Sequence, residues 1–246
     1  MEGMLEAVRG CLKEEMRMDV ISNNLANATS AGFKRDRISF QRILSQMPQD
    51  AEQTGSDNTS PSNSALVAIE TDFTQGDVRA TGNTLDFSIS GRGFFKVNTQ
   101  GGIRYTRKGN FALDLDGYLI TQKGERVTGK NGAINIWSDQ IEVDKRGRIL
   151  VEGSEVDRLD VVDLSEPEKL IKESGLLFRA PPDIQELSLD LETMIQQGYL
   201  EESNVNVAEE MVNMIHATRA FESYQKAMQL LDRLDNKATN EVSRLR

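Results

Sequence analysis

The sequence predicts an α+β protein: N- and C-terminal helices form a coiled-coil domain, and a central antiparallel β-rich domain, barrel- or sandwich-like, lies between them in the chain. Apolar residues recur at helical spacing near both ends. In the centre, short β-like runs recur between Gly, Asn and Asp residues. With 246 residues, 38% of them hydrophobic and 28% charged, the chain is long and apolar enough to bury a core.

The first helix is expected from about Leu5 to Leu25. Its apolar residues follow one another at spacings of four or three positions, interrupted by Glu15 and Ser22: Met4, Val8, Cys11, Met18 and Leu25. Asn and Ser residues at its end compete with the backbone for hydrogen bonds, which disfavours helix. Gly32 follows them, and we expect it to stop the helix in the left-handed conformation.

Composition divides the chain into four segments. Residues 1–42 hold the N-terminal helix and motif region of the coiled-coil domain. Residues 43–65 form a linker, because nearly every residue there is polar, Pro or Gly. Residues 66–195 form the β-rich domain with a polar return segment, in which a Pro-Pro pair breaks regularity. Residues 196–246 hold the C-terminal helix of the coiled-coil domain.

Short β-forming runs in the centre predict antiparallel hairpins. The clearest turn is Asp116-Gly117, where both residues are expected at positive φ. The expected strands are 94–97, 103–107, 111–113, 118–121, 134–137, 141–143, 148–151 and 159–164.

The C-terminal helix has a recognisable start. With Asn206 as the N-cap, Glu209 stands at the third helical position and gives a capping-box pattern, and the helix is expected to run to about Asn236. Its apolar residues alternate at spacings of 3 and 4 and define one narrow seam: Met214, Ala217, Phe221, Tyr224, Met228 and Leu231. Such a seam needs a partner helix, either the other terminus or the same element of another copy.

The net charge of −10 is concentrated in the centre of the chain. Residues 1–42 hold 7 Lys/Arg against 6 Asp/Glu, residues 196–246 hold 6 against 8, and the centre holds 16 against 25. This acidic centre disfavours nucleic acid as a partner, because phosphate binding needs clustered Lys and Arg. The longest uncharged apolar run, 65–69, is far shorter than the roughly 20 residues of a transmembrane helix, so no membrane insertion is expected.

No set of residues predicts catalysis, a cofactor or a metal site. His216 is the only histidine, and the sequence offers no second His or Cys pair for a zinc site and no Ser-His-Asp pattern around it. Asp114 and Asp116 imitate the start of a calcium loop, but the rest of the pattern is not met, because Tyr118 and Leu119 stand where such a loop needs Asp or Asn and then Gly. Cys11 is the single cysteine, and its apolar neighbours favour a packed residue over a reactive thiol. The protein is therefore predicted not to be an enzyme.

Two polar groups near the first helix leave alternatives open. Lys34, Arg35 and Arg37 form a small cationic group, which we expect to be a solvated face or, if functional, to pair with carboxylates on an adjacent subunit. Three asparagines are expected as helix-end residues, with an inter-subunit polar contact as the open alternative: Asn23, Asn24 and Asn27.

Sequence motifs follow one another along the chain, from Asn-Asn-Leu-Ala-Asn at 23–27 and Gly-Phe-Lys-Arg at 32–35 to Gly-Tyr-Leu-Glu-Glu-Ser-Asn-Val at 198–205. Between them stand further motifs at 72–76, 85–87, 91–95 and 105–111. The succession resembles the bacterial flagellar rod and hook protein family over both ends and much of the centre. The motif residues are Asn23, Asn24, Asn27, Gly32, Phe33, Lys34, Gly76, Gly91, Gly93, Phe94, Phe95, Tyr105, Thr106, Arg107, Gly109, Phe111, Gly198, Leu200, Glu201, Ser203, Asn204 and Val205.

The resemblance implies a structural subunit of the flagellar basal-body rod. Such a subunit self-assembles by packing of its terminal helices into the axial shaft that transmits torque to hook and filament. Within the family, this chain resembles the proximal rod protein most, because of its short length and its region 128–134, and the distal rod protein second. The alternatives are a distal rod subunit and a non-flagellar coiled-coil adaptor that presents an acidic β domain.

The implied partners are copies of this chain and other rod proteins in a helical assembly, the flagellar type III export apparatus, and ring or bushing proteins. The implied location is the periplasm-spanning rod, reached without a cleaved signal peptide, because charged residues stand where a signal peptide needs an apolar run. We expect the helices to order on assembly, since an unpaired seam is poorly stable in a monomer. The expected subunit-packing residues are Leu5, Val8, Leu12, Leu25, Met211, Met214, Ala217, Phe221, Tyr224, Met228 and Leu231.

Overall fold

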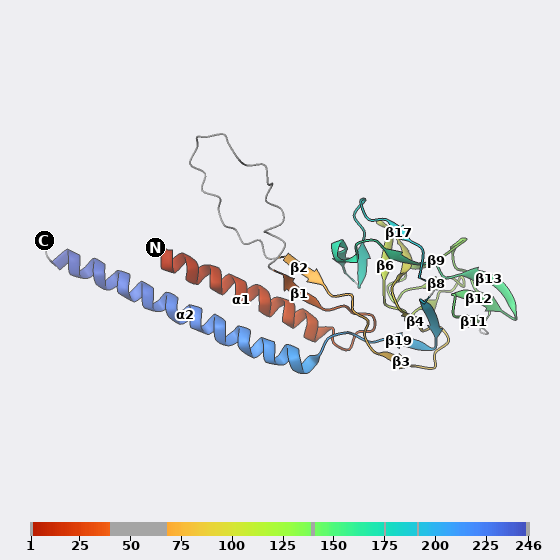
Figure 1. Cartoon of the computed structure of the whole chain (residues 1–246), viewed down its shortest axis with the longest axis horizontal. Helices are drawn as coiled ribbons and strands as arrows, with labels where there is room; N and C mark the ends of the chain where they lie inside the picture. Colours follow the sequence, from red (N-terminus) through yellow and green to blue (C-terminus); the bar gives the residue numbers. More distant parts are fainter. Residues whose placement is uncertain (1, 40–67, 139–140, 175, 191, 245–246) are drawn as a thin grey trace, which may run out of the picture. The chain divides into compact units, whose positions relative to one another are not determined.

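The structure is a computed structural model that describes residues 2–39, 68–138, 141–174, 176–190 and 192–244 (Figure 1). The chain forms two compact units. The helical unit comprises Met1–Ala26, Asp36–Glu70 and Asn206–Arg246, and the β unit comprises Asn27–Arg35 and Thr71–Val205. The linker expected at 43–65 lies outside the described residues.

Two long helices dominate the helical unit. Helix α1 spans Glu2–Ala26 and helix α2 spans Val207–Arg244, and they lie side by side in opposite directions (Figure 1). A two-stranded sheet of β1 (Asp36–Ser39) and β2 (Ala68–Thr71) completes the unit. Both predicted helices are confirmed, although α2 continues to Arg244, beyond the expected end at Asn236.

The N-cap of α2 is confirmed by a hydrogen bond, but the expected stop of α1 is wrong. Asn206 Oδ1 accepts the backbone N–H of Glu209 at 3.2 Å, as a capping side chain does. Gly32 has a φ of +68°, yet α1 already ends at Ala26. Its left-handed conformation serves a later turn, where a Cβ atom would lie 2.5 Å from the backbone N of Lys108.

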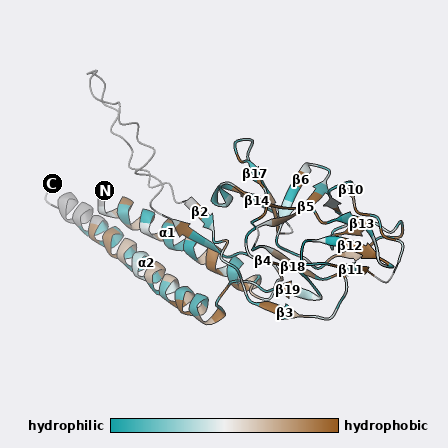
Figure 2. Cartoon of the chain, turned by 45° about the vertical axis from the view of Figure 1, so that its right-hand side comes forward, coloured by the Kyte–Doolittle hydropathy of each residue, from teal (hydrophilic) through white to brown (hydrophobic). Residues whose placement is uncertain are grey.

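The narrow seam of α2 packs against α1 of the same chain. Ala217 is completely buried, and Met214, Phe221, Met228 and Leu231 are partly buried along the same side. On α1 the buried apolar residues are Ala7, Cys11, Val20 and Ile21. Apolar residues alternate with polar ones along both helices (Figure 2). The partner that the seam needs is therefore the other terminus.

The β unit is built from short antiparallel strands. They are β3 (Val78–Ala80), β4 (Phe87–Ser90), β5 (Phe94–Thr99), β6 (Gly102–Thr106), β7 (Ala112–Leu113), β8 (Leu119–Ile120), β9 (Arg126–Gly129), β10 (Gly132–Ala133), β11 (Ile141–Val143), β12 (Arg148–Val151), β13 (Ser154–Arg158), β14 (Val161–Leu164), β15 (Ile171–Glu173), β16 (Leu177–Arg179), β17 (Glu186–Leu187), β18 (Met194–Gln197) and β19 (Tyr199–Glu201). A 3-10 turn at Pro167–Lys169 precedes β15.

The largest sheet has the strand order β15-β16-β6-β5-β9-β8-β7, with β10 paired to β9 and β14 paired to both β5 and β17. Separate small sheets are formed by β11-β12-β13, by β4 with β18 and by β3 with β19. Within the described residues β7 and β15 do not pair, so the large sheet is not closed into a barrel. The antiparallel β-rich character predicted for the centre is confirmed.

Two expectations for the strands are wrong. Residues 134–137 form no strand, although Asn135 makes an isolated bridge to Tyr118. The polar return segment, in which a Pro-Pro pair was expected to break regularity, contains β15, β16, β17 and the start of β18. Its strands β16 and β18 pair with β6 and β4, which lie far earlier in the chain. Polar side chains at these strands hide the alternation that marks a half-buried strand.

Strand β5 separates two apolar cores. Successive side chains of a strand point to opposite faces, so neighbouring phenylalanines enter different cores. Phe95 packs in a core with Phe87 and Phe111, and Phe94 packs in a second core with Phe178. The rings of Phe95 and Phe111 meet edge to face at 5.3 Å between centroids. The motif residues Phe94 and Phe95 are thus core residues of the β unit.

The predicted turn at Asp116-Gly117 joins β7 and β8, but with a different backbone. Gly117 has a φ of +77°, whereas Asp116 is not at positive φ, so that part of the expectation is wrong. Asp114 N donates to Tyr118 O at 2.9 Å, and Asp114 O accepts from Gly117 N at 3.1 Å. Asp114 Oδ1 also accepts from the backbone N–H groups of Asp116 and Tyr118. The hydrogen bonds of the aspartate thus stabilise a turn in which Gly117 is the one left-handed residue.

The same turn recurs between β11 and β12. Asp144 N donates to Arg148 O at 3.0 Å, and Gly147 N donates to Asp144 O at 2.9 Å. Asp144 Oδ1 accepts from the N–H groups of Arg146 and Arg148, as Asp114 does in the first turn. The two tip residues that follow the aspartate are Leu115 and Asp116 in one turn and Lys145 and Arg146 in the other. The same backbone geometry therefore carries an apolar and an acidic side chain at the first turn and two basic side chains at the second.

Alanine substitutions at two glycines of α1 test the helix contact. A Cβ atom at Gly10 would lie 2.4 Å from the Tyr224 ring, whereas one at Gly3 would lie 3.8 Å from Leu231. Gly3→Ala should stabilise the helical unit by roughly 0.5–1 kcal/mol, the ordinary gain of Ala over Gly in a helix. Gly10→Ala should not give this stabilisation, because the Tyr224 ring would have to move away from the new methyl group. Urea unfolding followed by helical circular dichroism measures both free energies.

Tyr224→Ala provides the control for this pair. Once the ring is absent, Gly10→Ala should stabilise the helical unit as Gly3→Ala does. If Gly10→Ala had the same effect with and without Tyr224, the contact between the two helices at this level would be refuted.

Candidate functional site

Residues from distant motifs meet in a buried ionic group within the β unit, here called the charge cluster: Lys34, Arg35, Asp72, Arg107 and Glu201. Lys34 is completely buried, and its Nζ lies 2.5 Å from Glu201 Oε1 and donates to Thr74 O at 2.6 Å. Glu201 Oε1 also accepts from the backbone N–H of Gly76 at 3.0 Å. The Gly-Phe-Lys motif is thereby joined to the motifs that contain Gly76 and Glu201.

Arg107 is the second buried cation of the charge cluster. Its Nη1 lies 3.2 Å from Glu201 Oε2 and donates to Ile89 O, and its Nη2 donates to Gly91 O at 2.6 Å. The guanidinium carbon lies 5.6 Å from the centroid of the Phe94 ring, which adds a cation–π contact. Glu201 therefore compensates two cations, one with each carboxylate oxygen.

Asn204 ties the outer part of the charge cluster together. Its Oδ1 accepts the backbone N–H of Arg35 at 2.8 Å, and its Nδ2 donates to Asp72 O at 2.8 Å. Arg35 in turn pairs through Nε with Asp72 Oδ2 at 3.2 Å. These bonds connect the chain just before α2, at Asn204, to the segments that carry Arg35 and Asp72.

Burial sets the electrostatics of the two central cations. It lowers the pKa of the Lys34 ammonium and the pKa of the Arg107 guanidinium, and the negative charge of Glu201 opposes the shift in both groups. Buried charges of this kind are costly unless they are paired and hydrogen-bonded. Because Lys34 and Glu201 are fully enclosed, neither can touch a substrate, and the cluster serves to hold chain segments in register.

The charge cluster corrects the expectation for the cations after α1. Lys34 is not part of a solvated face, and Lys34 and Arg35 pair with carboxylates of their own chain rather than of an adjacent subunit. Sequence analysis missed Asp72 as a site residue, although it opens the motif at 72–76. The signal that could have identified Asp72 is its charge, because it is the only charged residue of that motif.

Other motif residues support the same unit. Phe33 is buried, and Lys172 Nζ lies 4.0 Å from the centroid of its ring. Tyr105 Oη donates to Glu186 Oε1 at 2.7 Å, and burial together with this carboxylate raises the pKa of the phenol. The remaining motif residues in the β unit are Gly32, Gly93, Phe95, Thr106, Gly109, Phe111, Gly198, Leu200, Ser203 and Val205.

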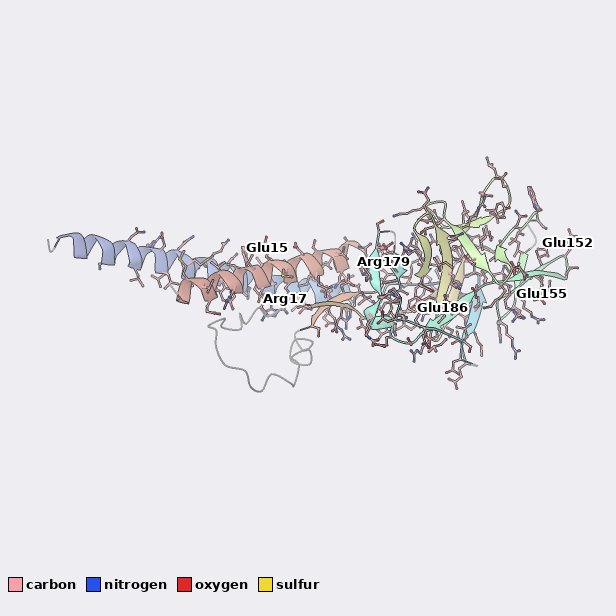
Figure 3. The ribbon with its side chains drawn as sticks, turned by 90° about the horizontal axis from the view of Figure 1, so that it is seen from above. Glu15, Arg17, Glu152, Glu155, Arg179 and Glu186 are labelled. Atoms are coloured by element: carbon pink, nitrogen blue, oxygen red, sulfur yellow. The ribbon has the colours of Figure 1, made fainter. Side chains whose placement is uncertain are left out.

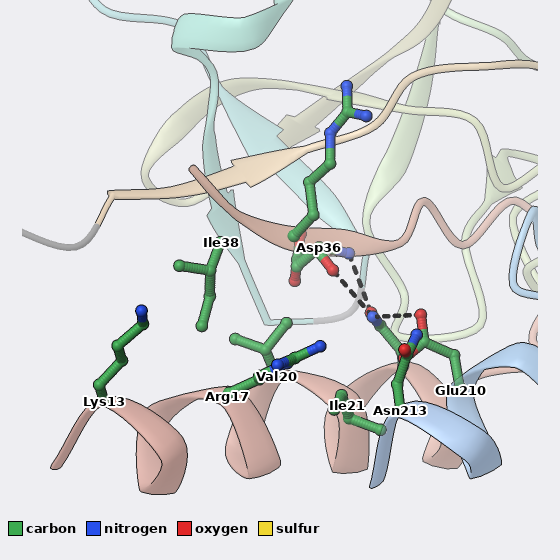
Figure 4. Close-up of a pocket in the computed structure, with 10 residues that line it drawn as sticks. Lys13, Arg17, Val20, Ile21, Asp36, Ile38, Glu210 and Asn213 are labelled. Atoms are coloured by element: carbon green, nitrogen blue, oxygen red, sulfur yellow. Dashed lines mark hydrogen bonds between the residues drawn. The ribbon is translucent and has the colours of Figure 1, made fainter. Parts of the chain in front are cut away.

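Asn24 lies at a cavity of about 340 Å³ in the helical unit (Figure 4). Its Nδ2 donates to Asp36 O at 2.8 Å and to Glu210 Oε1 at 3.4 Å, and its Oδ1 accepts from Asp36 N at 2.9 Å. Arg37, the third cation of the predicted group, also lines this cavity. Asn24 is thus a buried link between α1, β1 and α2, whereas Asn23 is exposed and Asn27 Oδ1 accepts from Ser30.

The residues expected to pack subunits together fall into two groups. One group lies along the contact between α1 and α2: Met214, Ala217, Phe221, Tyr224, Met228 and Leu231. The other is exposed: Leu5 at 51%, Val8 at 38%, Leu12 at 54% and Met211 at 55%. Leu25 is intermediate. Sequence analysis missed further exposed apolar residues of α2, among them Val212 and Ile215, because they lie off the narrow seam.

Charged side chains cover much of the remaining described surface (Figure 3). Glu15 and Arg17 project from α1, and Glu152 and Glu155 project from the β12–β13 hairpin. Neither helix in the described part of the chain has an apolar stretch that would cross a membrane.

Comparison with known proteins gives two matching family models. The model described as flagellar basal body rod FlgEFG protein C-terminal matches residues 196–241, which include Glu201 and most of α2. The model described as flagellar hook protein FlgE/F/G D1 domain matches residues 88–151, which include Arg107. Both models therefore cover parts of the charge cluster.

Full-length relatives give the same result. The chain is 34% identical to the flagellar basal-body rod protein FlgG of Buchnera aphidicola subsp. Schizaphis graminum, over 90% of this chain and 92% of the relative. It is 29% identical to the FlgG protein of Bacillus subtilis over 98% of both chains. It is also 30% identical to the flagellar basal-body rod protein FlgF of Caulobacter vibrioides, over 93% of this chain and 92% of the relative.

Two neighbouring glutamates test the role of the charge cluster. Glu201→Gln leaves two buried cations without their counter-charge and should destabilise the β unit by roughly 3–5 kcal/mol. Glu202 pairs with Arg79 at the surface, so Glu202→Gln should cost less than about 1 kcal/mol. Thermal unfolding of both variants measures the difference. Losses of similar size at the two positions would contradict the assignment of Glu201 as the central counter-ion.

Proposed function

Because this chain belongs to the flagellar basal-body rod protein family, we propose that it is a structural subunit of the proximal rod. Family membership confirms the prediction of a basal-body rod protein that is structural rather than enzymatic and acts with other rod components. In the proposal, many copies pack side by side into an axial shaft that transmits torque to the hook and filament.

The outward apolar residues of the two helices carry this proposal: Leu5, Val8 and Leu12 on α1 and Met211, Val212 and Ile215 on α2. The seam between the helices is already filled within the chain, so these side chains need a different partner. Exposed apolar side chains gathered on a helix face mark interaction sites, and each helix carries such a group at a different level of the pair. Burying the exposed part of each Leu-sized side chain contributes roughly 1 kcal/mol, so several together favour association of copies.

The spacing of the helix contacts supports a coiled-coil geometry as part of the proposal. Gly3, Gly10 and Asn24 on α1 meet Leu231, Tyr224 and Glu210 on α2, and the positions along each helix differ by seven or fourteen residues. A seven-residue repeat keeps one side of each helix turned toward its partner. The terminal helices would then act as one rigid element.

The position along the rod and the outer partners also belong to the proposal. We assign the proximal rod from the region 128–134, with a distal rod subunit as the alternative. The export apparatus and ring or bushing proteins are proposed partners. A non-flagellar adaptor would form a small closed oligomer, whereas a rod subunit forms monomers or open polymers, and light scattering distinguishes these states.

Hydrogen exchange tests the coupling of helix order to assembly. The helical unit has a narrow internal contact and exposed apolar side chains, so amides of 207–235 should exchange readily in the dilute monomer. They should become protected once copies assemble. Strong protection at low concentration, unchanged by assembly, would refute the coupling.

Charged substitutions on α1 test the outward apolar residues. Leu5→Glu and Leu12→Glu place a charge where copies are proposed to meet and should weaken assembly at least about tenfold. Ser22→Glu is the matched control, because it adds the same charge at an exposed polar position of α1. Sedimentation measures assembly, circular dichroism checks folding, and motility of the bacterium reports function. Normal assembly and motility of folded Leu12→Glu would contradict the proposal.

A further inference from the structure

The only tryptophan of the chain is exposed on the β unit. Trp137 is 78% exposed, and Leu115, at the tip of the turn between β7 and β8, is 101% exposed. Large apolar side chains gain nothing from this exposure, since moving them out of water into a packed contact is favourable. Neither residue is used by the cores, the charge cluster or the outward apolar residues of the helices.

Trp137 lies against the same turn that carries Leu115. A Cβ atom at Gly117 would lie 3.3 Å from Trp137 Cδ2, and Asn135 Nδ2 donates to Asp116 O at 2.8 Å. The side chain of Asp116 is exposed beside them. Leu115, Asp116 and Trp137 therefore form one patch, here called the tryptophan patch, with an apolar centre and an acidic edge.

A cationic hollow of about 430 Å³ lies at the other turn of the same backbone type. Its lining residues are Asp144, Lys145, Arg146, Arg148 and Arg158. Arg148 pairs with Asp144 at 2.7 Å, and Arg158 lies near Glu155. Lys145 and Arg146 are exposed at the turn tip and have no ion pair within the described residues, so they supply the available positive charge.

We propose that the tryptophan patch of one copy docks on the cationic hollow of a second copy. The inference rests on the proposed function, because it needs copies of this chain to be brought together by their helices. It adds a specific contact between β units, in which Trp137 faces Lys145 and Arg146 and Asp116 pairs with a cation of the hollow.

Chemical complementarity selects a second copy as the occupant. Tryptophan is the best aromatic partner for a cation, and an acidic residue beside it matches the second positive charge. The two surfaces share no residue, so the contact is heterologous and can repeat from copy to copy, as a helical assembly requires. The central segment carries 16 Lys/Arg against 25 Asp/Glu, so unpaired β units repel one another and a cationic site on each unit offsets this repulsion.

The single tryptophan gives a direct measurement on the full chain. Fluorescence of the dilute monomer should show an exposed indole that acrylamide quenches freely. When light scattering reports assembly, the emission should shift to shorter wavelength and the quenching should fall. Assembly without either change would overturn this inference and leave the proposed function intact. Absence of assembly under all conditions would overturn both.

Charge reversal tests whether the cationic hollow is the site on which the tryptophan patch docks. Arg146→Glu should abolish the fluorescence shift and raise the concentration for half-assembly about tenfold. Adding Asp116→Lys should restore both, because the pair is then reversed. Lys123→Glu is the matched control, since it makes the same charge change at an exposed position outside the hollow. A shift that persists in folded Arg146→Glu, or a loss that Asp116→Lys does not restore, would overturn the inference.

Discussion

The β unit depends on the compensation of two buried cations by Glu201. Lys34 and Arg107 come from segments far apart in the chain, and each binds a different oxygen of this carboxylate. A buried cation without a partner costs several kcal/mol, so these segments are stable only when brought together. The backbone N–H of Gly76 donates a further hydrogen bond to Glu201, and Asn204 joins the neighbouring segments at Arg35 and Asp72. The ionic group therefore adds little net stability by itself, but it excludes arrangements in which the segments are misaligned.

The helical unit follows a different constraint, because its two helices offer more apolar surface than their mutual contact can cover. Ala217 is fully buried between them, whereas Leu12 and Met211 remain about half exposed. A rod subunit gains from this surplus, since the same surface that weakens the isolated helical unit stabilises an assembly. The β unit, by contrast, has two apolar cores of its own and a buried ionic group in which Glu201 pairs with both cations.

Local features of the structure were predictable from the sequence, and long-range pairing was not. Asn206 caps α2 as expected, because a cap depends only on residues within one helical turn. The turn at Gly117 was located correctly, but its type differs from the predicted one, because Asp114 accepts two backbone N–H groups and only Gly117 is at positive φ. Strands β16, β18 and β19 were missed, because distant partners and not their own alternation make them strands. Lys34 was expected in solvent, since nothing nearby in the sequence reveals Glu201.

By itself the sequence determined the class of the protein: two terminal helices with apolar stripes, an acidic β-rich centre and the ordered motifs of a flagellar rod protein. These are properties of spacing, composition and short segments, which do not require knowledge of what packs where. Tertiary structure alone decided that the seam of α2 is filled by α1, that Lys34 is buried, and that Trp137 lies against the turn that carries Asp116. The reason is physical: burial and ionic pairing depend on distances between residues that are remote along the chain, and those distances exist only once the chain has folded.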